Sequence, residues 1–316
     1  MRVLITGGAG FLGTHLAQRL LRRGDTVGIF DGVVSYDAVG SLAGKVSVVQ
    51  GDLTDRRLVF SVVANFRPQS IFHLGALLPP ATEVDPVLAI QTNIAGTQHV
   101  LDAAADSGVA QVVFTSTIAT FGRGVTSPVP NEAPQLPVSV YGATKAAAER
   151  LGEIAYQRTR RDFRGVRFPS VIGPGRTVSG LGAYVHHMLA AGAAGRPWTV
   201  PVAPESRSEV LPVEEATRAL LAVHDAAPEG LRYRMYNIAG LRPSAAEVAA
   251  ALARARPEAQ FSFHPDPQMT AWLEERLYLD DRAARTDWGW APAHDLDALV
   301  ASYLADAART GGDIPR

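Results

Sequence analysis

The chain has no cysteine among its 316 residues, which excludes disulfides, thiolate nucleophiles and metal sites built on thiolates. It also lacks any apolar run near the roughly 18–20 residues that span a bilayer. The first apolar stretch, VLIT, is shorter than the core of a secretory signal, so we expect a cytoplasmic protein. The chain also has no excess of charge of either sign, since Lys+Arg number 30 and Asp+Glu number 31. We therefore expect neither a nucleic-acid partner nor a membrane partner.

Short β-branched runs alternate with longer amphipathic stretches through the first half of the chain. The runs predict strands at 3–6, 26–30, 46–49, 70–74, 111–116 and 165–168. The stretches between them predict helices at 11–23, 54–65, 86–107 and 142–160. Further helices are predicted at 181–194, 213–226, 243–255 and 296–308, with a short one in 280–292 that Gly289 ends. This alternation predicts an α/β fold, a doubly wound parallel sheet with helices on both faces.

A glycine-rich loop, TGGAGFLG (6–13), follows the first predicted strand and opens a helix. In it Gly7 allows a tight turn, Gly10 lets the backbone approach a pyrophosphate, and the third glycine lets helix and strand pack closely. The N–H groups at the helix start, at Phe11 and Leu12, would face the phosphates. Because the loop lies at a strand-to-helix junction, it predicts a dinucleotide site.

Asp31 ends the second predicted strand, 24 positions after Gly7. A carboxylate there can accept hydrogen bonds from the ribose hydroxyls of NAD and would repel the 2′-phosphate of NADP. We therefore predict NAD as the cofactor, with a turn cap beside Gly32 as the alternative role of Asp31. No metal site is predicted, since the chain offers no carboxylate at ligand spacing from its adjacent His186 and His187.

Two further strand ends supply cofactor contacts. After the third strand, Asp52 and Leu53 of GDLTD are placed to flank the adenine. At the end of the fourth strand, small residues in HLGA let the cofactor lie against backbone, which adds Leu74, Gly75 and Ala76. His73, inside an apolar strand end, is interpreted as structural.

Tyr141 and Lys145 stand four residues apart in YGATK at the start of a predicted helix, so both side chains lie on one face. A free tyrosine has a pKa of about 10, and a nearby ammonium stabilises the phenolate. Such a pair can remove the proton of a secondary alcohol while a hydride moves to nicotinamide, and the lysine can hold the nicotinamide ribose. A third donor is needed for the substrate oxygen, and Ser116 or Thr117 at the end of the fifth strand is placed to supply it.

Taken together, these motifs resemble the extended short-chain dehydrogenase/reductase family, the NAD-dependent epimerases and dehydratases. The resemblance covers nearly the whole chain and adds Asn93 of QTNIAGT as a cofactor-site position. It implies a Rossmann NAD-binding domain at 1–168, to which segments of 205–240 return. It also implies a smaller C-terminal α/β domain at 169–316 that mainly binds substrate. Helices near 86–107 and 142–160 commonly pair across a dimer in this family, so a homodimer is expected.

Several segments are similar to the L-threonine 3-dehydrogenases of this superfamily and to the D-erythronate dehydrogenase group, notably APESRSEVLP (203–212). The resemblance implies NAD-linked oxidation of a secondary alcohol on a small hydroxy or amino acid. Leu78, Thr117, Thr177, Ser179 and Arg207 are the candidate substrate contacts. The guanidinium of Arg207 suits a carboxylate or a phosphate.

Two other functions remain open at this point. A nucleotide-sugar epimerase or dehydratase would use the same residues and return the hydride within one turnover. A non-catalytic NAD sensor would share the fold, although it has no need of the Tyr, Lys and hydroxyl set.

Overall fold

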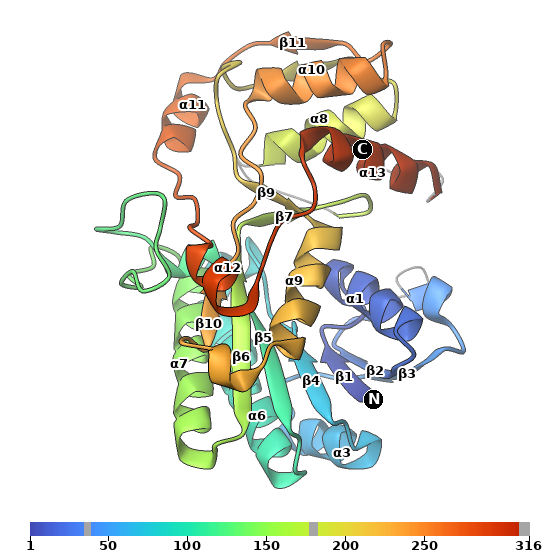
Figure 1. The fold of residues 1–316 in the computed structure, drawn as a ribbon, viewed down its shortest axis with the longest axis vertical. Helices are drawn as coiled ribbons and strands as arrows, with labels where there is room; N and C mark the ends of the chain where they lie inside the picture. The colour runs from blue at the N-terminus through green and yellow to red at the C-terminus, as the bar shows by residue number, and fades with distance from the viewer. Residues whose placement is uncertain (35–38, 177–182, 310–316) are drawn as a thin grey trace. The chain divides into compact units, whose positions relative to one another are not determined.

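Parallel strands form the main sheet of the computed structural model, which describes residues 1–34, 39–176 and 183–309 (Figure 1). The sheet has seven strands in the order β10-β6-β5-β4-β1-β2-β3, and every neighbouring pair is parallel. Chain order reverses between β1 and β4, which makes the carboxyl ends of these strands the expected ligand crevice. The predicted doubly wound sheet is confirmed. The strands are β1 (Arg2–Thr6), β2 (Thr26–Asp31), β3 (Val46–Gln50), β4 (Ser70–His73), β5 (Gln111–Thr117), β6 (Asp162–Phe168) and β10 (Met235–Asn237).

Contacts along the chain divide it into two compact units. The first comprises Met1–Phe168, Thr217–Ile238 and Asp280–Trp290, and it holds the seven-stranded sheet. The second comprises Pro169–Ala216, Ala239–Leu279 and Ala291–Arg316.

Helices cover both faces of the sheet in the first unit. On one face lie α3 (Arg56–Phe66), α6 (Gly96–Asp106) and α7 (Val140–Thr159), which pack Val63, Val100 and Ala148 into the core. On the other face lie α1 (Phe11–Arg22) and α9 (Val213–Asp225), as Figure 1 shows. A short α12 (Arg282–Trp288) ends where predicted, at Gly289 in the left-handed region with φ +71°.

The helix predicted at 86–107 is one helical stretch with a change of pitch inside it. It runs through α5 (Pro86–Ala89), the π-helical turn η2 (Ile90–Ala95) and α6. A short α4 (Ala81–Val84) precedes it, and Asp85 caps α5 by accepting from the backbone of Leu88. A π turn inserts one residue into a helix and is often found at functional sites.

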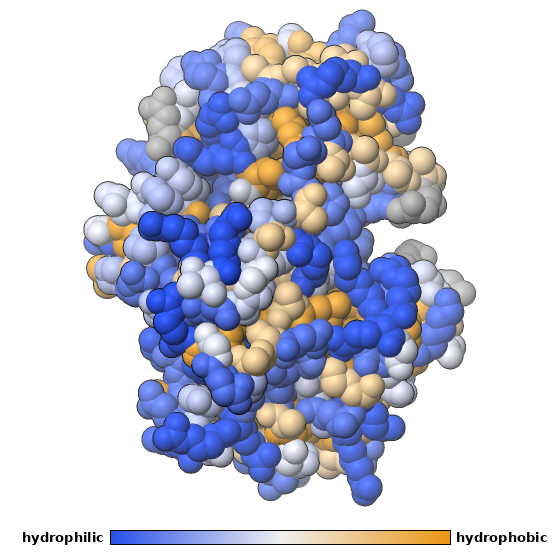
Figure 2. All heavy atoms as spheres, viewed as in Figure 1, coloured by the Kyte–Doolittle hydropathy of each residue, from blue (hydrophilic) through white to orange (hydrophobic). Residues whose placement is uncertain are grey.

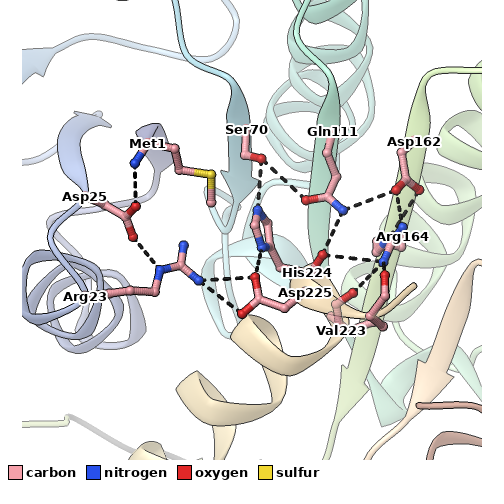
Figure 3. A network of polar contacts seen from close by, with 11 residues as sticks. Met1, Arg23, Asp25, Ser70, Gln111, Asp162, Arg164, Val223, His224 and Asp225 are labelled. Atoms are coloured by element: carbon pink, nitrogen blue, oxygen red, sulfur yellow. Dashed lines mark hydrogen bonds and ion pairs between the residues drawn. The ribbon is translucent and has the colours of Figure 1, made fainter. Parts of the chain in front are cut away.

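A polar network fastens α9 at the amino ends of the strands, opposite the expected crevice (Figure 3). The buried guanidinium of Arg164 donates to the carbonyl of Ala226 at 2.6 Å and so satisfies the end of α9. His224 contacts Ser70, the first residue of β4, at 3.0 Å, and its carbonyl accepts from Gln111, the first residue of β5. These bonds hold α9 in place and leave the carboxyl ends of the strands to ligands.

The second unit has its own hydrophobic core and two small parallel sheets. One sheet pairs β7 (Ser170–Ile172) with β9 (Val210–Pro212), and the other pairs β8 (Trp198–Val200) with β11 (Phe261–Phe263). Its helices are α8 (Tyr184–Ala193), α10 (Ala245–Ala255), α11 (Pro267–Glu274) and α13 (Leu296–Arg309). The long helices of this unit were predicted from the sequence, whereas α11 was not, and these three-residue strands are too short for an alternating pattern.

None of the helices in the described ranges is long and apolar enough to cross a membrane. The face drawn in Figure 2 is mostly hydrophilic, with hydrophobic residues scattered across it. Within the same ranges, no three His, Asp or Glu side chains form a group that could hold a metal ion.

Candidate active site

The glycine loop turns tightly between β1 and α1. Gly7 has φ +68°, and a Cβ there would lie 2.6 Å from the backbone nitrogen of Gly75. At Gly13 a Cβ would lie 2.3 Å from the carbonyl oxygen of Gly7, so α1 packs directly on the loop. At Gly10 the atom nearest to a Cβ would be that same oxygen, at 3.3 Å, and the residue is exposed. The surrounding backbone thus requires glycine at positions 7 and 13, while Gly10 is exposed and could be approached by a ligand.

The start of α1 is built to receive an anion. In the described part of the chain, no side chain caps this helix at Gly10 and its first turn carries no acidic residue. The positive end of the helix dipole at this helix start therefore favours an anion. A dinucleotide pyrophosphate fits this combination of exposed glycine and helix start.

Asp31 lies at the carboxyl end of β2, as predicted, and its carboxylate also braces the glycine loop. Its Oδ2 accepts from the backbone of Ala9 at 2.9 Å, and its Oδ1 accepts from Val33 at 3.2 Å. A carboxylate has about four lone-pair positions, so these two bonds leave capacity for ribose hydroxyls. Asp31 also caps the turn after β2, the alternative role considered for it, since Val33 donates its backbone N–H to this side chain.

Two of the other predicted cofactor residues, Gly75 and Leu53, lie against each other, and Leu53 is 8% exposed. A Cβ on Gly75 would lie 2.9 Å from its Cδ1, and Leu74 donates its backbone N–H to the carbonyl of Thr6. Ala76 follows in the same half-buried stretch. The side chain of Asp52 binds its own loop, since its Oδ1 accepts from the backbone N–H of Thr54 at 2.8 Å.

Asn93 lies in the π-helical turn and ties the segment after β4 to the helix α7. Its Oδ1 accepts from the backbone of Leu77 at 2.7 Å, while its Nδ2 donates to the carbonyl of Leu77 and to Thr144 Oγ1, both at 3.0 Å. The neighbouring Thr97 contacts His73 at 2.9 Å. Asn93 thus has a firm structural task, and His73 is buried and hydrogen-bonded as interpreted.

Tyr141 is the second residue of α7, where the helix start packs on the end of β5. Ser139 caps the helix by accepting from Gly142 at 3.0 Å. A Cβ at Gly142 would lie 2.0 Å from the carbonyl oxygen of Ala119, two residues after Thr117. The close approach holds Tyr141 beside the carboxyl end of β5, where the third donor is expected.

Lys145 is 3% exposed, one turn after Tyr141, and its Nζ lies 4.0 Å from the centroid of the Phe114 ring. Burial lowers the pKa of Lys145 to about 7, while the carboxylate of Glu149 opposes that shift. Burial together with the charge of Lys145 lowers the pKa of His73 to about 3, so this imidazole is neutral at neutral pH. The site therefore holds an ammonium whose charge depends on its acidic neighbour.

Ser116 and Thr117 are adjacent in β5, so their side chains point to opposite faces of the sheet. The hydroxyl of Ser116 is buried and donates to Glu149, which commits it to the interior. The hydroxyl of Thr117 accepts from the backbone of Ala119 at 3.2 Å, and its own proton remains to be donated. We therefore retain Thr117 and withdraw Ser116 as the residue that orients the substrate.

A buried ion pair behind the site was missed from the sequence. Glu149, fully buried, faces Arg167, and the Nη2–Oε2 distance is 2.8 Å. Gln135 donates to the same carboxylate at 2.8 Å, and Arg167 donates to Asn237 Oδ1 at 3.1 Å. One signal was available, because Glu149 follows Lys145 at the same four-residue spacing by which Lys145 follows Tyr141.

The predicted substrate contacts are less closely gathered. Leu78 is 53% exposed in the segment after β4. Arg207 belongs to the second unit, where Glu247 accepts from it at 2.8 and 3.0 Å. Thr177 and Ser179 lie outside the described residues. Thr117 ends β5, on which the start of α7 with Tyr141 packs.

Comparison with known proteins agrees with this geometry. Bovine (Bos taurus) mitochondrial L-threonine 3-dehydrogenase is 34% identical over 310 residues, which cover 96% of this chain and 82% of the relative. D-erythronate dehydrogenase of Cupriavidus necator is 32% identical over 267 residues, which cover 80% and 82%. Among solved structures, a GalE-like L-threonine dehydrogenase from Cupriavidus necator in its holo form matches with a TM-score of 0.87 and 28% identity, over 97% of this chain and 99% of that one.

A family pattern covers most of the chain as well. The NAD dependent epimerase/dehydratase family matches residues 3–239. This match confirms both the predicted family and the predicted cofactor, NAD. With its parallel sheet, its glycine loop and its Tyr141/Lys145 helix, the chain belongs to the NAD dependent epimerase/dehydratase family.

Proposed function

We propose that this protein is an NAD-dependent dehydrogenase that oxidises the secondary alcohol of a small polar hydroxy or amino acid, L-threonine-like or a sugar acid. Two relatives support it, since one is named for threonine and the other for erythronate. The epimerase hypothesis is not favoured, because these relatives are named as dehydrogenases. A pure NAD sensor is disfavoured by the complete set of Tyr141, Lys145 and Thr117.

The observation that carries the proposal is the packing of the start of α7 on the end of β5. It places Tyr141 at the carboxyl edge of the sheet, with the buried ammonium of Lys145 one turn behind it. Thr117 ends β5 at the same edge. An ionisable phenol, a cation and a hydroxyl donor at one strand edge suit proton removal from an alcohol.

In the proposed reaction, the hydroxyl of Thr117 donates to the substrate oxygen and orients it. The phenolate of Tyr141 takes the hydroxyl proton as the carbon–oxygen double bond forms. Bound NAD supplies the acceptor for the hydride that leaves the same carbon. Lys145 stabilises the phenolate, and the start of α1 and Asp31 hold the cofactor. The substrate would leave as a ketone, and its hydroxyl proton would stay on the phenol of Tyr141.

A substrate panel tests the proposal. NADH formation at 340 nm is measured with excess NAD and L-threonine, aldonates, uronates or UDP-sugars. We expect net NADH with a hydroxy or amino acid. Conversion of a UDP-sugar to its epimer without net NADH would overturn the proposal in favour of an epimerase.

We also propose that the second unit mainly binds substrate and that the protein acts as a homodimer. A hollow between α6 and α7 supports the dimer, because apolar side chains line it, among them Leu101, Leu151 and the 42%-exposed Ile154. Light scattering should give twice the chain mass, and Ile154→Glu should lower it; a monomeric wild type would contradict the dimer. The cytoplasmic location stays a prediction, since the bovine relative is named as mitochondrial.

A further inference from the structure

The first N–H groups of α7 find their acceptors in two different places. The cap residue Ser139 accepts from Gly142 through its hydroxyl and from Ala143 through its carbonyl. The two remaining groups, at Val140 and Tyr141, donate to one carboxylate that comes from α4. It is Glu83, whose Oε2 lies 3.2 Å from the first nitrogen and whose Oε1 lies 3.1 Å from the second.

The carboxylate of Glu83 is itself well held. The hydroxyl of Thr82, a fully buried residue, donates to its Oε1 at 3.2 Å. The backbone hydrogen bond from Tyr141, with further help from Val140 and Thr82, keeps the pKa of the Glu83 carboxyl below its usual range. Glu83 is therefore ionised at neutral pH, and its exposure to solvent favours the same charged form.

The carbonyl of Tyr141 is held from the same connection between β4 and α6. Thr144 Oγ1 donates to that carbonyl at 2.8 Å and accepts from Asn93 Nδ2 at 3.0 Å. Asn93 also fixes the backbone of Leu77 in both directions. Both peptide groups of Tyr141 are thus fastened to one connection, the N–H by Glu83 and the C=O through Thr144.

We propose that Glu83 is a positioning residue for catalysis, which fixes the backbone of Tyr141 by binding the first two N–H groups of α7. The inference rests on the proposed function, in which the phenol of Tyr141 is the base. A helix start without this carboxylate would fray into water, and the phenol would sample positions away from the substrate oxygen. Displacements of about 1 Å in a catalytic group can cost on the order of 100-fold in rate.

Asp85 gives a matched control for the test. It lies two residues after Glu83 on the same connection, is exposed, and caps α5 by accepting from Leu88 at 2.9 Å. Asp85→Ala removes the same charge and a helix cap of the same kind, but the cap is that of α5 and not that of α7. Glu83→Gln keeps an oxygen that can accept, whereas Glu83→Ala leaves none.

The experiment measures kcat, the KM of the substrate, and the Kd of NAD for these three variants and the wild type. We expect Glu83→Ala to lower kcat by about 10- to 100-fold while the Kd of NAD stays within about threefold. Glu83→Gln should recover part of the loss, and Asp85→Ala should keep at least about half of the wild-type kcat. Equal kcat in Glu83→Ala and Asp85→Ala would overturn the proposal.

A second readout separates this proposal from the proposed function. Hydrogen exchange of a peptide that spans 139–143 should be faster in Glu83→Ala and unchanged in Asp85→Ala, whether or not the protein turns over an alcohol. Failure of the wild type to reduce NAD would reject the dehydrogenase assignment alone. Equal exchange in the two variants would reject the role of Glu83.

Discussion

The pair formed by Glu149 and Arg167 predicts a large and strongly coupled loss of stability. The two side chains are 0% and 4% exposed, and they meet at 2.8 Å. Replacing one partner leaves the other as an uncompensated buried charge, which costs about 3–5 kcal/mol. We therefore expect Glu149→Leu and Arg167→Met each to lower the free energy of unfolding by that amount.

The double variant should cost far less than the sum of the two single changes. Neither charge of the pair remains in it, and the loss is that of the hydrogen bonds that Ser116, Gln135, Asn131 and Asn237 make to the pair. At about 0.5–1.5 kcal/mol each, these bonds total about 2–6 kcal/mol. Against a sum of about 6–10 kcal/mol for the two single changes, the midpoints of these ranges give a coupling energy of about 4 kcal/mol.

Urea unfolding followed by tryptophan fluorescence measures all three variants against the wild type. The control is the ion pair of Arg254 and Asp297, whose side chains are 60% and 66% exposed. Its single variants should each change the free energy of unfolding by less than about 1 kcal/mol. Strictly additive costs for Glu149→Leu and Arg167→Met, or single costs as small as those of the control, would refute the reasoning.

The remaining predictions concern cofactor choice and acid stability. Asp31→Ala should lower the preference for NAD over NADP in kcat/KM, because the 2′-phosphate is no longer repelled; an unchanged ratio would contradict the role of Asp31. For His73, the pKa is about 3 in the folded state against 6.5 when free, so below pH 6.5 the unfolded chain binds the proton first and stability falls as pH falls. Between pH 6.5 and 5 this fall amounts to about 2 kcal/mol in urea unfolding. His73→Asn should reduce the fall by about that amount, while His186, His187 and His224, whose pKa burial also lowers, continue to contribute to it. A fall as large as that of the wild type would contradict the role of His73.

The local motifs of the site could be predicted because each follows from short-range chemistry. A glycine is required at position 7 because φ is positive there and the backbone of Gly75 lies close by. The four-residue spacing of Tyr141 and Lys145 follows from helical periodicity. Apolar runs likewise marked the central strands, which are buried on both faces.

The long-range partners could not be predicted from the sequence. Glu83 binds a backbone group 58 positions away, and nothing in its neighbourhood indicates that target. The choice between Ser116 and Thr117 depends on which face of β5 meets Glu149, which a strand pattern alone leaves open. The strands of the second unit are too short to give any periodic signal.

The central claim is that the phenol of Tyr141 takes the proton of the substrate alcohol. The most direct test compares NADH formation at 340 nm by the wild type and Tyr141→Phe, with the best substrate of the panel and with the Kd of NAD measured in parallel. We expect Tyr141→Phe to lose at least about 100-fold in kcat while its Kd of NAD stays within about threefold of the wild-type value. Turnover by Tyr141→Phe at a rate near that of the wild type would contradict it.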